Sequence, residues 1–250
     1  MLSLTIYIWI IDVIINRCKV RYTVAITFDD GPYTHTAEIL NLLRHFNVKA
    51  TFFVSGNNLG KGMIDDPNTE WPSLLRRMIS EGHQIGSHGW GHENLEKATP
   101  EVREKQIIYN EMAIRNVIGM VPKYFRPPYG SCTIGSGCLT DLTRWGYKVV
   151  NWEYDTRDIF HNDPEEIQFS KDVVVDAFPD EYFTLDEGLT TRLFLAHDTQ
   201  YQTAYNLTEF MIRFIEKQGY KMVTVADCLG DDPEDWYYDA RFQSECFHPS

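Results

Sequence analysis

The chain has little positive charge and no apolar run long enough to cross a membrane comfortably. Its 250 residues include 23 Lys and Arg against 36 Asp and Glu, which gives a formal net charge of −13. Because no basic patch offsets this excess, nucleic acid and anionic membrane surfaces are disfavoured as partners. The apolar run at residues 2–15 is shorter than a bilayer span requires. A neutral or cationic substrate is compatible with this composition.

Residues 1–17 form a hydrophobic N-terminal segment that is similar to the apolar region of a signal peptide. No Lys or Arg precedes the apolar run and Asp12 interrupts it, so a strand-like or amphipathic segment packed on the domain is the alternative. Membrane association is expected only if this segment stays uncleaved. The rest of the chain has no internal repeat and no linker. We therefore expect one domain over 18–230 and a C-terminal tail over 231–250.

Cysteine is scarce, with five residues in the chain. Cys132 and Cys138 lie close together in a Gly- and Ser-rich loop, where a small disulfide is sterically easy. Cys18, Cys228 and Cys246 lie near the termini, and one bridge among them would tie the ends of the domain together. The odd count leaves one thiol over. This distribution favours an extracytoplasmic location.

Apolar periodicity predicts a chain in which strands alternate with helices. The expected strands are 24–28, 50–54, 84–87, 123–125, 147–152, 192–196 and 221–225. The expected helices are 34–46, 71–81, 100–117, 139–145, 165–177 and 207–218, with Thr99 as the N-cap of the longest. This alternation predicts a mostly parallel α/β sheet or barrel.

Two adjacent carboxylates follow the first predicted strand. The apolar residues end at Phe28, and Gly31-Pro32 forces a turn directly after Asp29 and Asp30. In α/β architectures the carboxyl edge of the sheet is where ligands and chemistry collect. If strand geometry persists, the two acids point opposite ways, so one can bind a cation while the other moves protons. The alternative is an ordinary polar turn.

Two histidines four positions apart follow a later strand, within Ser-His-Gly-Trp-Gly-His. On a helical turn, His88 and His92 would share one face within reach of one metal ion, whereas a chance pair on a surface loop is the alternative. With Asp30 they supply two nitrogens and one carboxylate, the open three-ligand pattern of catalytic zinc sites. Gly89 and Gly91 would let the backbone approach the site closely.

Three further strand ends carry polar residues. Arg126 is followed by two prolines that stiffen its loop, and beside Asp29 it would keep that carboxylate ionised and oriented. The run Asp-Thr-Arg-Asp at 155–158 could supply a carboxylate to a histidine. His197 ends another strand and can donate a proton near neutral pH. The alternatives are a surface arginine, an acidic loop and a structural histidine.

Taken in order, these motifs resemble the series found in the polysaccharide deacetylases, the NodB-homology esterases of carbohydrate esterase family 4. The resemblance covers about residues 20–230 and rests on Thr-Phe-Asp-Asp-Gly-Pro, Ser-His-Gly-Trp-Gly-His, Arg-Pro-Pro-Tyr-Gly, Asp-Thr-Arg-Asp and Leu-Phe-Leu-Ala-His-Asp. The cysteine positions and the run Val-Thr-Val-Ala-Asp-Cys-Leu-Gly look most like fungal-type chitin deacetylases. The resemblance implies an irregular (β/α) barrel with fewer than eight complete strands. It also implies disulfides Cys18–Cys228 and Cys132–Cys138, with Cys246 left over.

The resemblance implies which residues hold a metal and which residue acts as the base. Asp30, His88 and His92 would bind a divalent metal, with zinc expected and cobalt as the alternative. Asp29 would be the general base, held in place by Arg126.

The remaining implied roles concern the acid and the substrate. His197 would be the general acid, tuned by Asp155, and the backbone amide of Tyr129 would stabilise the oxyanion. Tyr129, Ile159 and Leu195 would contact the substrate. At Ile159 the family motif usually has Trp, which walls the pocket near the acid histidine. The smaller residue leaves that wall thinner, which could alter substrate preference or lower activity.

The implied activity is the metal-dependent removal of N-acetyl groups from chitin or N-acetylglucosamine polymers, which yields acetate and a chitosan-like product. We expect a secreted, cell-wall-associated monomer that acts in wall remodelling. One alternative is a member without turnover that serves as a wall-associated glycan-binding protein. Another is a deacetylase of a different acetylated glycan, such as peptidoglycan or acetylated xylan, which the fungal-like cysteines disfavour.

Overall fold

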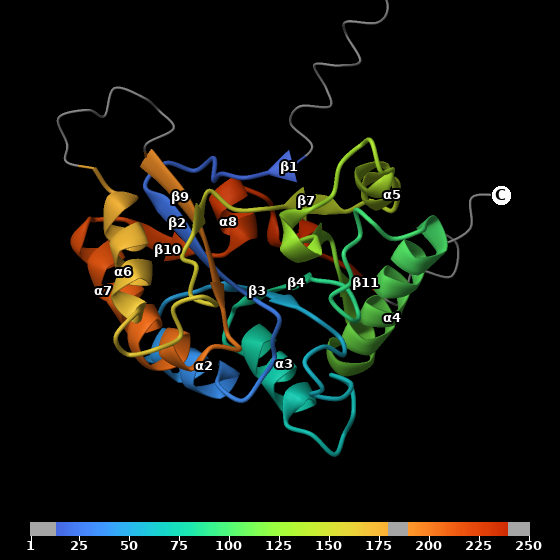
Figure 1. Ribbon diagram of the computed structural model, residues 1–250, viewed down its shortest axis with the longest axis horizontal. Coiled ribbons are helices and arrows are strands. Elements are labelled where there is room, and N and C mark those ends of the chain that lie inside the picture. Colours follow the sequence, from blue (N-terminus) through green and yellow to red (C-terminus); the bar gives the residue numbers. More distant parts are fainter. Residues whose placement is uncertain (1–13, 180–189, 240–250) are drawn as a thin grey trace, which may run out of the picture.

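A curled sheet forms the centre of the molecule, and helices pack around its outer side (Figure 1). The computed structural model describes residues 14–179 and 190–239. The strands are β1 Ile14–Ile15, β2 Thr23–Asp29, β3 Thr51–Val54, β4 Gln84–Ser87, β5 Met120–Pro122, β6 Tyr124–Phe125, β7 Lys148–Val150, β8 Tyr154–Asp155, β9 Thr191–His197, β10 Lys221–Val223 and β11 Tyr237–Asp239. The helices are α2 Thr36–His45, α3 Trp71–Ser80, α4 Pro100–Ile118, α5 Cys138–Arg144, α6 Ile167–Asp176, α7 Thr208–Lys217 and α8 Val225–Leu229.

The main sheet is parallel throughout its described pairs. Its order is β1-β7-β6-β4-β3-β2-β9-β8, and β10 pairs with the first half of β2. Among the described strands, only β2, β3, β4 and β9 reach four residues. The expected α/β fold, an irregular barrel with few complete strands, is confirmed.

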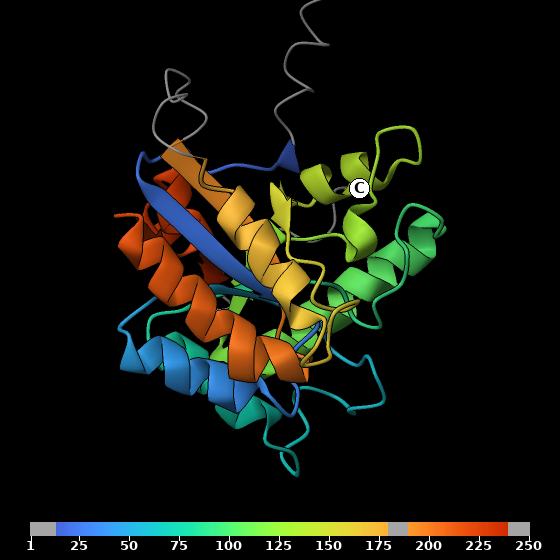
Figure 2. The same ribbon diagram turned by 60° about the vertical axis from the view of Figure 1, so that its left-hand side comes forward.

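The helices lie where the alternation predicted them. Figure 2 shows α2, α6 and α7 side by side along one side of the sheet. The N-cap prediction for α4 is confirmed, because Thr99 accepts a hydrogen bond from the Val102 N–H. Across the described parts of the chain, no helix is both long and apolar enough to pass through a bilayer.

The structure also contains short elements that periodicity did not predict. Among the described strands and α-helices, these are β1, β5, β8, α8 and β11, all with five residues or fewer. β1 lies inside the predicted segment 1–17 and pairs with β7. β11 lies inside the predicted tail and pairs antiparallel with β5. Such short elements carry too few residues for a periodic pattern, so tertiary pairing decides them.

Alternation along each strand sorts side chains between two apolar clusters. In β2, Ile26 and Phe28 pack under the helices, whereas Ala25 belongs to a second cluster on the inner face of the sheet. β9 follows the same rule, with Phe194 under the helices and Leu193 inside. Because successive side chains point to opposite faces, the last residues of β2 and β9 point to the inner face.

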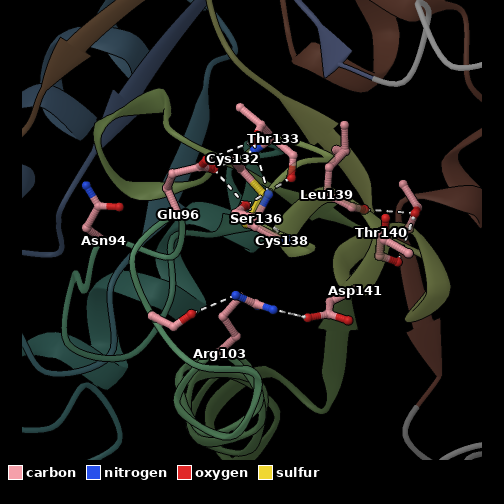
Figure 3. The surroundings of a disulfide bond; sticks show 12 residues. Asn94, Glu96, Arg103, Cys132, Thr133, Ser136, Cys138, Leu139, Thr140 and Asp141 are labelled. Carbon is pink, nitrogen blue, oxygen red and sulfur yellow. Dashed lines mark hydrogen bonds and ion pairs between the residues drawn. A yellow bond between two sulfur atoms is a disulfide. The ribbon is translucent and has the colours of Figure 1, made fainter.

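Both predicted disulfides are present. Cys18, just before β2, bonds to Cys228 in α8, which closes a sequence separation of 210 residues. Cys132 bonds to Cys138 at the start of α5. Around the second bridge, the Glu96 carboxylate accepts hydrogen bonds from the Thr133 and Ser136 hydroxyls (Figure 3). Cys246 lies outside the described residues.

Candidate active site and metal centre

One carboxylate and two histidines converge beyond the carboxyl ends of β2 and β4. Asp30, His88 and His92 each offer one ligand atom, and these atoms lie within 4.8 Å of one another. Asp30 Oδ1 lies 3.3 Å from His92 Nε2 and 3.6 Å from His88 Nε2. This oxygen is buried and has no hydrogen-bond partner within residues 14–179 and 190–239. The unpaired Asp30 oxygen and the two imidazole nitrogens together form a set of ligand atoms that fits a divalent cation, zinc in particular.

The protonation of His88 suits a metal ligand. Its Nδ1 lies 2.6 Å from the backbone oxygen of Arg126, so this nitrogen carries the hydrogen and leaves Nε2 with a lone pair toward Asp30. Burial lowers the pKa of His88 to about 3, which keeps the imidazole neutral. The ring is therefore fixed in both orientation and tautomer.

Left-handed backbone positions, rather than a helical turn, bring the ligands together. Asp30 has φ +77° and His92 has φ +59°, and Gly89 between the two histidines has φ +79°. The helical turn considered for residues 88–92 is wrong, since the chain bends there without helical hydrogen bonds. Gly89 permits that bend because it lacks a Cβ.

Asp29 is the last residue of β2 and is held by a buried arginine. Arg126 Nη1 donates to Asp29 Oδ1 at 2.7 Å and to Thr27 Oγ1 at 2.6 Å. Its other nitrogens donate to the backbone oxygens of Val150 and Asn151. Burial raises the pKa of Asp29, and the Arg126 charge opposes that rise. The predicted pairing of Asp29 with Arg126 is therefore present, and it leaves Asp29 Oδ2 unbound by arginine.

Asp158, and not Asp155, holds His197. Asp158 Oδ1 lies 2.7 Å from His197 Nδ1, and its Oδ2 accepts the His197 backbone N–H at 2.7 Å and the Thr203 hydroxyl. Asp155 instead accepts the backbone N–H of Arg157. The assignment of Asp155 as the partner of His197 is corrected, because Asp155 still lies within β8, where its register partner is Leu195.

The environment of His197 favours the charged imidazolium. Burial alone would lower the pKa of His197, but the negative charge of Asp158 and the hydrogen bond to it raise the pKa to about 9. Burial would raise the pKa of Asp158, but the His197 charge together with hydrogen bonds from His197 and Thr203 lowers it below its usual value. The pair therefore presents a protonated imidazole at neutral pH.

Asp29 and His197 are register partners on adjacent parallel strands. Partners in register point to the same face, so the Asp29 carboxylate and the His197 imidazole face the same space above the inner cluster. His88 Nε2 lies 3.7 Å from Asp29 Oδ2, which brings the metal ligands beside that space.

The predicted substrate residues lie at different depths. Tyr129 is exposed, and its ring lies 4.6 Å from the His92 ring. Ile159 is also exposed, in the loop that follows Asp158. Leu195 is buried on β9, two residues before His197 and therefore on the same face, beneath the site.

Sequence reasoning missed three groups of this site. Asp158 had the same motif signal as Asp155, so the sequence alone left the choice between them unresolved. Thr27 lies in β2 and Arg126 follows β6, and the two residues meet only when the sheet has folded. Lys61 donates to the Asp30 backbone oxygen from a loop that no motif marks.

Comparison with known proteins agrees with this arrangement. The family model described as "Polysaccharide deacetylase" matches residues 16–150. The "Chitin deacetylase" of Colletotrichum lindemuthianum is 39% identical over 223 residues, 89% of this chain and 86% of that protein. The "Chitin deacetylase" of a Pestalotiopsis species is 39% identical over 227 residues, 91% of this chain and 70% of that protein.

A solved structure shares the fold. The structure of the chitin deacetylase from the fungal pathogen Colletotrichum lindemuthianum aligns with a TM-score of 0.82 at 37% identity, covering 90% of this chain and 95% of that one. The expected enzyme class, a polysaccharide N-deacetylase, is confirmed at the level of the family. From its motifs, its fold and these relatives, the chain belongs to the polysaccharide deacetylase family.

Proposed function

We propose that this protein removes N-acetyl groups from chitin or related N-acetylglucosamine polymers, with a zinc ion held by Asp30, His88 and His92. The observation that carries the proposal is the register pairing of Asp29 with His197 beside these three ligands. The two fungal relatives named above support chitin as the substrate class.

The bound cation would supply Lewis-acid chemistry, polarising the acetyl carbonyl and lowering the pKa of a water molecule. Asp29 Oδ2 accepts a proton from the attacking water, whose oxygen bonds to the acetyl carbonyl carbon, while Arg126 fixes Asp29 Oδ1. The backbone amide of Tyr129 donates to the developing oxyanion.

His197 donates a proton to the leaving nitrogen. Its imidazolium is stabilised by Asp158, so the proton is available at neutral pH. An amide nitrogen leaves poorly unless protonated, and a positioned general acid typically contributes about 10²- to 10⁴-fold in rate. The bond between carbonyl carbon and nitrogen breaks, and acetate and a free amino sugar result.

We further propose that residues 18–230 act as the deacetylase domain of a secreted, wall-associated monomer. The two disulfides support an oxidising compartment. A signal segment would then end before Ile14, because Ile14 and Ile15 pair with β7 in the sheet. The acidic net charge suits a product that carries free amines.

Metal analysis combined with an acetate assay tests this function. We expect one zinc per chain and acetate release from chitin oligomers that exceeds release from peptidoglycan or acetylated xylan. Full zinc occupancy and glycan binding without acetate release would favour the glycan-binding alternative. Faster release from peptidoglycan or xylan would contradict the substrate class but leave the chemistry intact.

A further inference from the structure

The peptide bond between Asp30 and Gly31 is held from both sides by buried charged residues. Its carbonyl oxygen, on Asp30, accepts a hydrogen bond from Lys61 Nζ at 2.8 Å. Its N–H side, at Gly31, lies against the Asp198 carboxylate, and this backbone group favours the charged form of Asp198. This peptide directly follows the carboxylate that faces His88 and His92, and it leaves Asp30 in the left-handed region at φ +77°.

Asp198 fits closely against this turn. A Cβ placed on Gly31 would lie 1.8 Å from Asp198 Oδ2, so the carboxylate fills the space that a side chain would need. The Thr36 hydroxyl donates to the same oxygen at 2.6 Å. The next carbonyl, on Gly31, accepts the Ser55 N–H at 3.1 Å. The carbonyl oxygens of Asp30 and Gly31 thus both accept hydrogen bonds, whereas Asp198 Oδ1 has no partner among the described residues.

Lys61 reaches the turn from the loop between β3 and α3. Its own backbone oxygen accepts the Trp71 indole N–H at 2.9 Å, which fixes the loop. Lys61 is 9% exposed and Asp198 is 1% exposed. Burying two charges is costly, and here burial outweighs their mutual attraction, so that it lowers the pKa of Lys61 and raises the pKa of Asp198. A hydrophobic pair would stabilise the fold at lower cost, which points to a positioning role for these two charged residues.

We propose that Lys61 and Asp198 are positioning residues that lock the Asp30–Gly31 peptide and so aim Asp30 Oδ1 at the two imidazoles. A left-handed non-glycine residue is strained, and its carboxylate would turn away if the following peptide could rotate. Two opposite charges on the two ends of the peptide dipole oppose that rotation. The inference rests on the proposed metal site and adds two residues that support it without contacting the cation.

Direct titration with Zn²⁺ against a chelating dye tests this role without an activity assay. Removing a group that orients a metal ligand typically weakens metal binding by about 10- to 100-fold, and we expect this loss in Lys61→Met. Asp198→Asn keeps the shape but not the charge, and we expect a loss of the same kind. Lys49→Met is the matched control, since Lys49 Nζ also donates to a backbone oxygen, that of Glu81. The control should bind Zn²⁺ as the wild type does.

Thermal unfolding with and without Zn²⁺ separates positioning from a general loss of stability. A positioning role predicts that Lys61→Met gains less in Tm from Zn²⁺ than the wild type, while Lys49→Met gains the full amount. If Lys61→Met does not fold, Thr36→Val removes one hydrogen bond of Asp198, and we expect a several-fold loss of affinity there.

Wild-type Zn²⁺ affinity in the folded Lys61 and Asp198 variants would overturn the positioning role while leaving the proposed function intact. A wild-type chain that binds no Zn²⁺ would instead overturn the metal site itself, and this role with it.

Discussion

The inner face of the sheet differs between its two ends. Toward the carboxyl ends of β2 and β9, the buried side chains are charged and paired, as in Asp29 with Arg126 and His197 with Asp158. Toward the amino ends, the same face buries apolar residues such as Leu193 beside the Cys18–Cys228 disulfide.

This difference separates chemistry from stability along the strand direction. Buried charges are costly to desolvate, so each one at the carboxyl end is held by a partner that also aims it. At the amino end the apolar cluster and the covalent bridge need no such compensation. We therefore expect the largest changes in turnover from substitutions at the carboxyl end, and losses of stability with turnover preserved from substitutions at the amino end.

Replacing the base should give the largest effect at the carboxyl end. Asp29→Asn keeps the shape and a hydrogen-bond acceptor for Arg126 but cannot accept the proton. We expect kcat to fall by about 10²- to 10⁴-fold. Steady-state acetate release measures the loss, and thermal unfolding is the control. Unchanged kcat would remove Asp29 from the chemistry.

Removing the bridge should give the largest effect at the amino end. In Cys18→Ser with Cys228→Ser, loss of a native disulfide is expected to lower the free energy of unfolding by about 2–5 kcal/mol. Denaturant unfolding measures it, and kcat at a temperature where the variant is folded should stay within about twofold. The Cys132–Cys138 bridge closes a much shorter loop, so Cys132→Ser with Cys138→Ser should lower the free energy of unfolding by less.

The pH dependence of kcat and of stability should be set by the pairing of His197 with Asp158. The pKa of His197 in the folded protein, about 9, lies above its ordinary value of 6.5. The acid is therefore protonated at neutral pH, and kcat should fall as the pH rises through about 9. The same shift stabilises the fold fully below pH 6.5, and this contribution is lost as the pH rises toward 9.

Asp158→Asn removes the charge that raises the pKa of His197. We expect the alkaline fall in kcat to move to lower pH, and the stability difference from wild type to be largest below pH 6.5. Asp155→Asn is the matched control, because Asp155 does not contact His197. If the alkaline fall in kcat moved in Asp155→Asn but not in Asp158→Asn, Asp155 would be the partner that sets the pKa of His197.

The smallest expected effect is at the rim. Ile159→Trp restores the side chain that the family motif usually has, and the larger ring would thicken the pocket wall. An added apolar contact in a pocket is worth about 1–3 kcal/mol, and position 159 is exposed, so we expect a change in KM for chitin oligomers at the low end of that range, about tenfold. Equal kinetics on short and long oligomers would show that this position does not contact the sugar.

Much of the site could be predicted because its residues follow strands directly. Asp29, Asp30 and His197 lie at or just after strand ends, where apolar alternation stops and the parallel sheet brings them to one edge. Arg126 follows β6 in the same way.

The missed features depend on long-range geometry. Whether Asp155 or Asp158 meets His197 is decided by where β8 ends and by the left-handed turn at Arg157, φ +56°. Lys61 lies in a loop with no periodic pattern, and only the folded chain brings it to Asp30. The bend at 88–92 likewise depends on backbone angles that spacing alone does not reveal.

Zinc titration of the metal-free chain, followed by acetate release at each point, tests the central claim most directly. The account predicts a rate that rises linearly to one equivalent of Zn²⁺ and then levels off, and a His88→Ala variant that stays at background throughout. A metal-free chain with full activity, or a His88→Ala variant that matches the wild type, would contradict it.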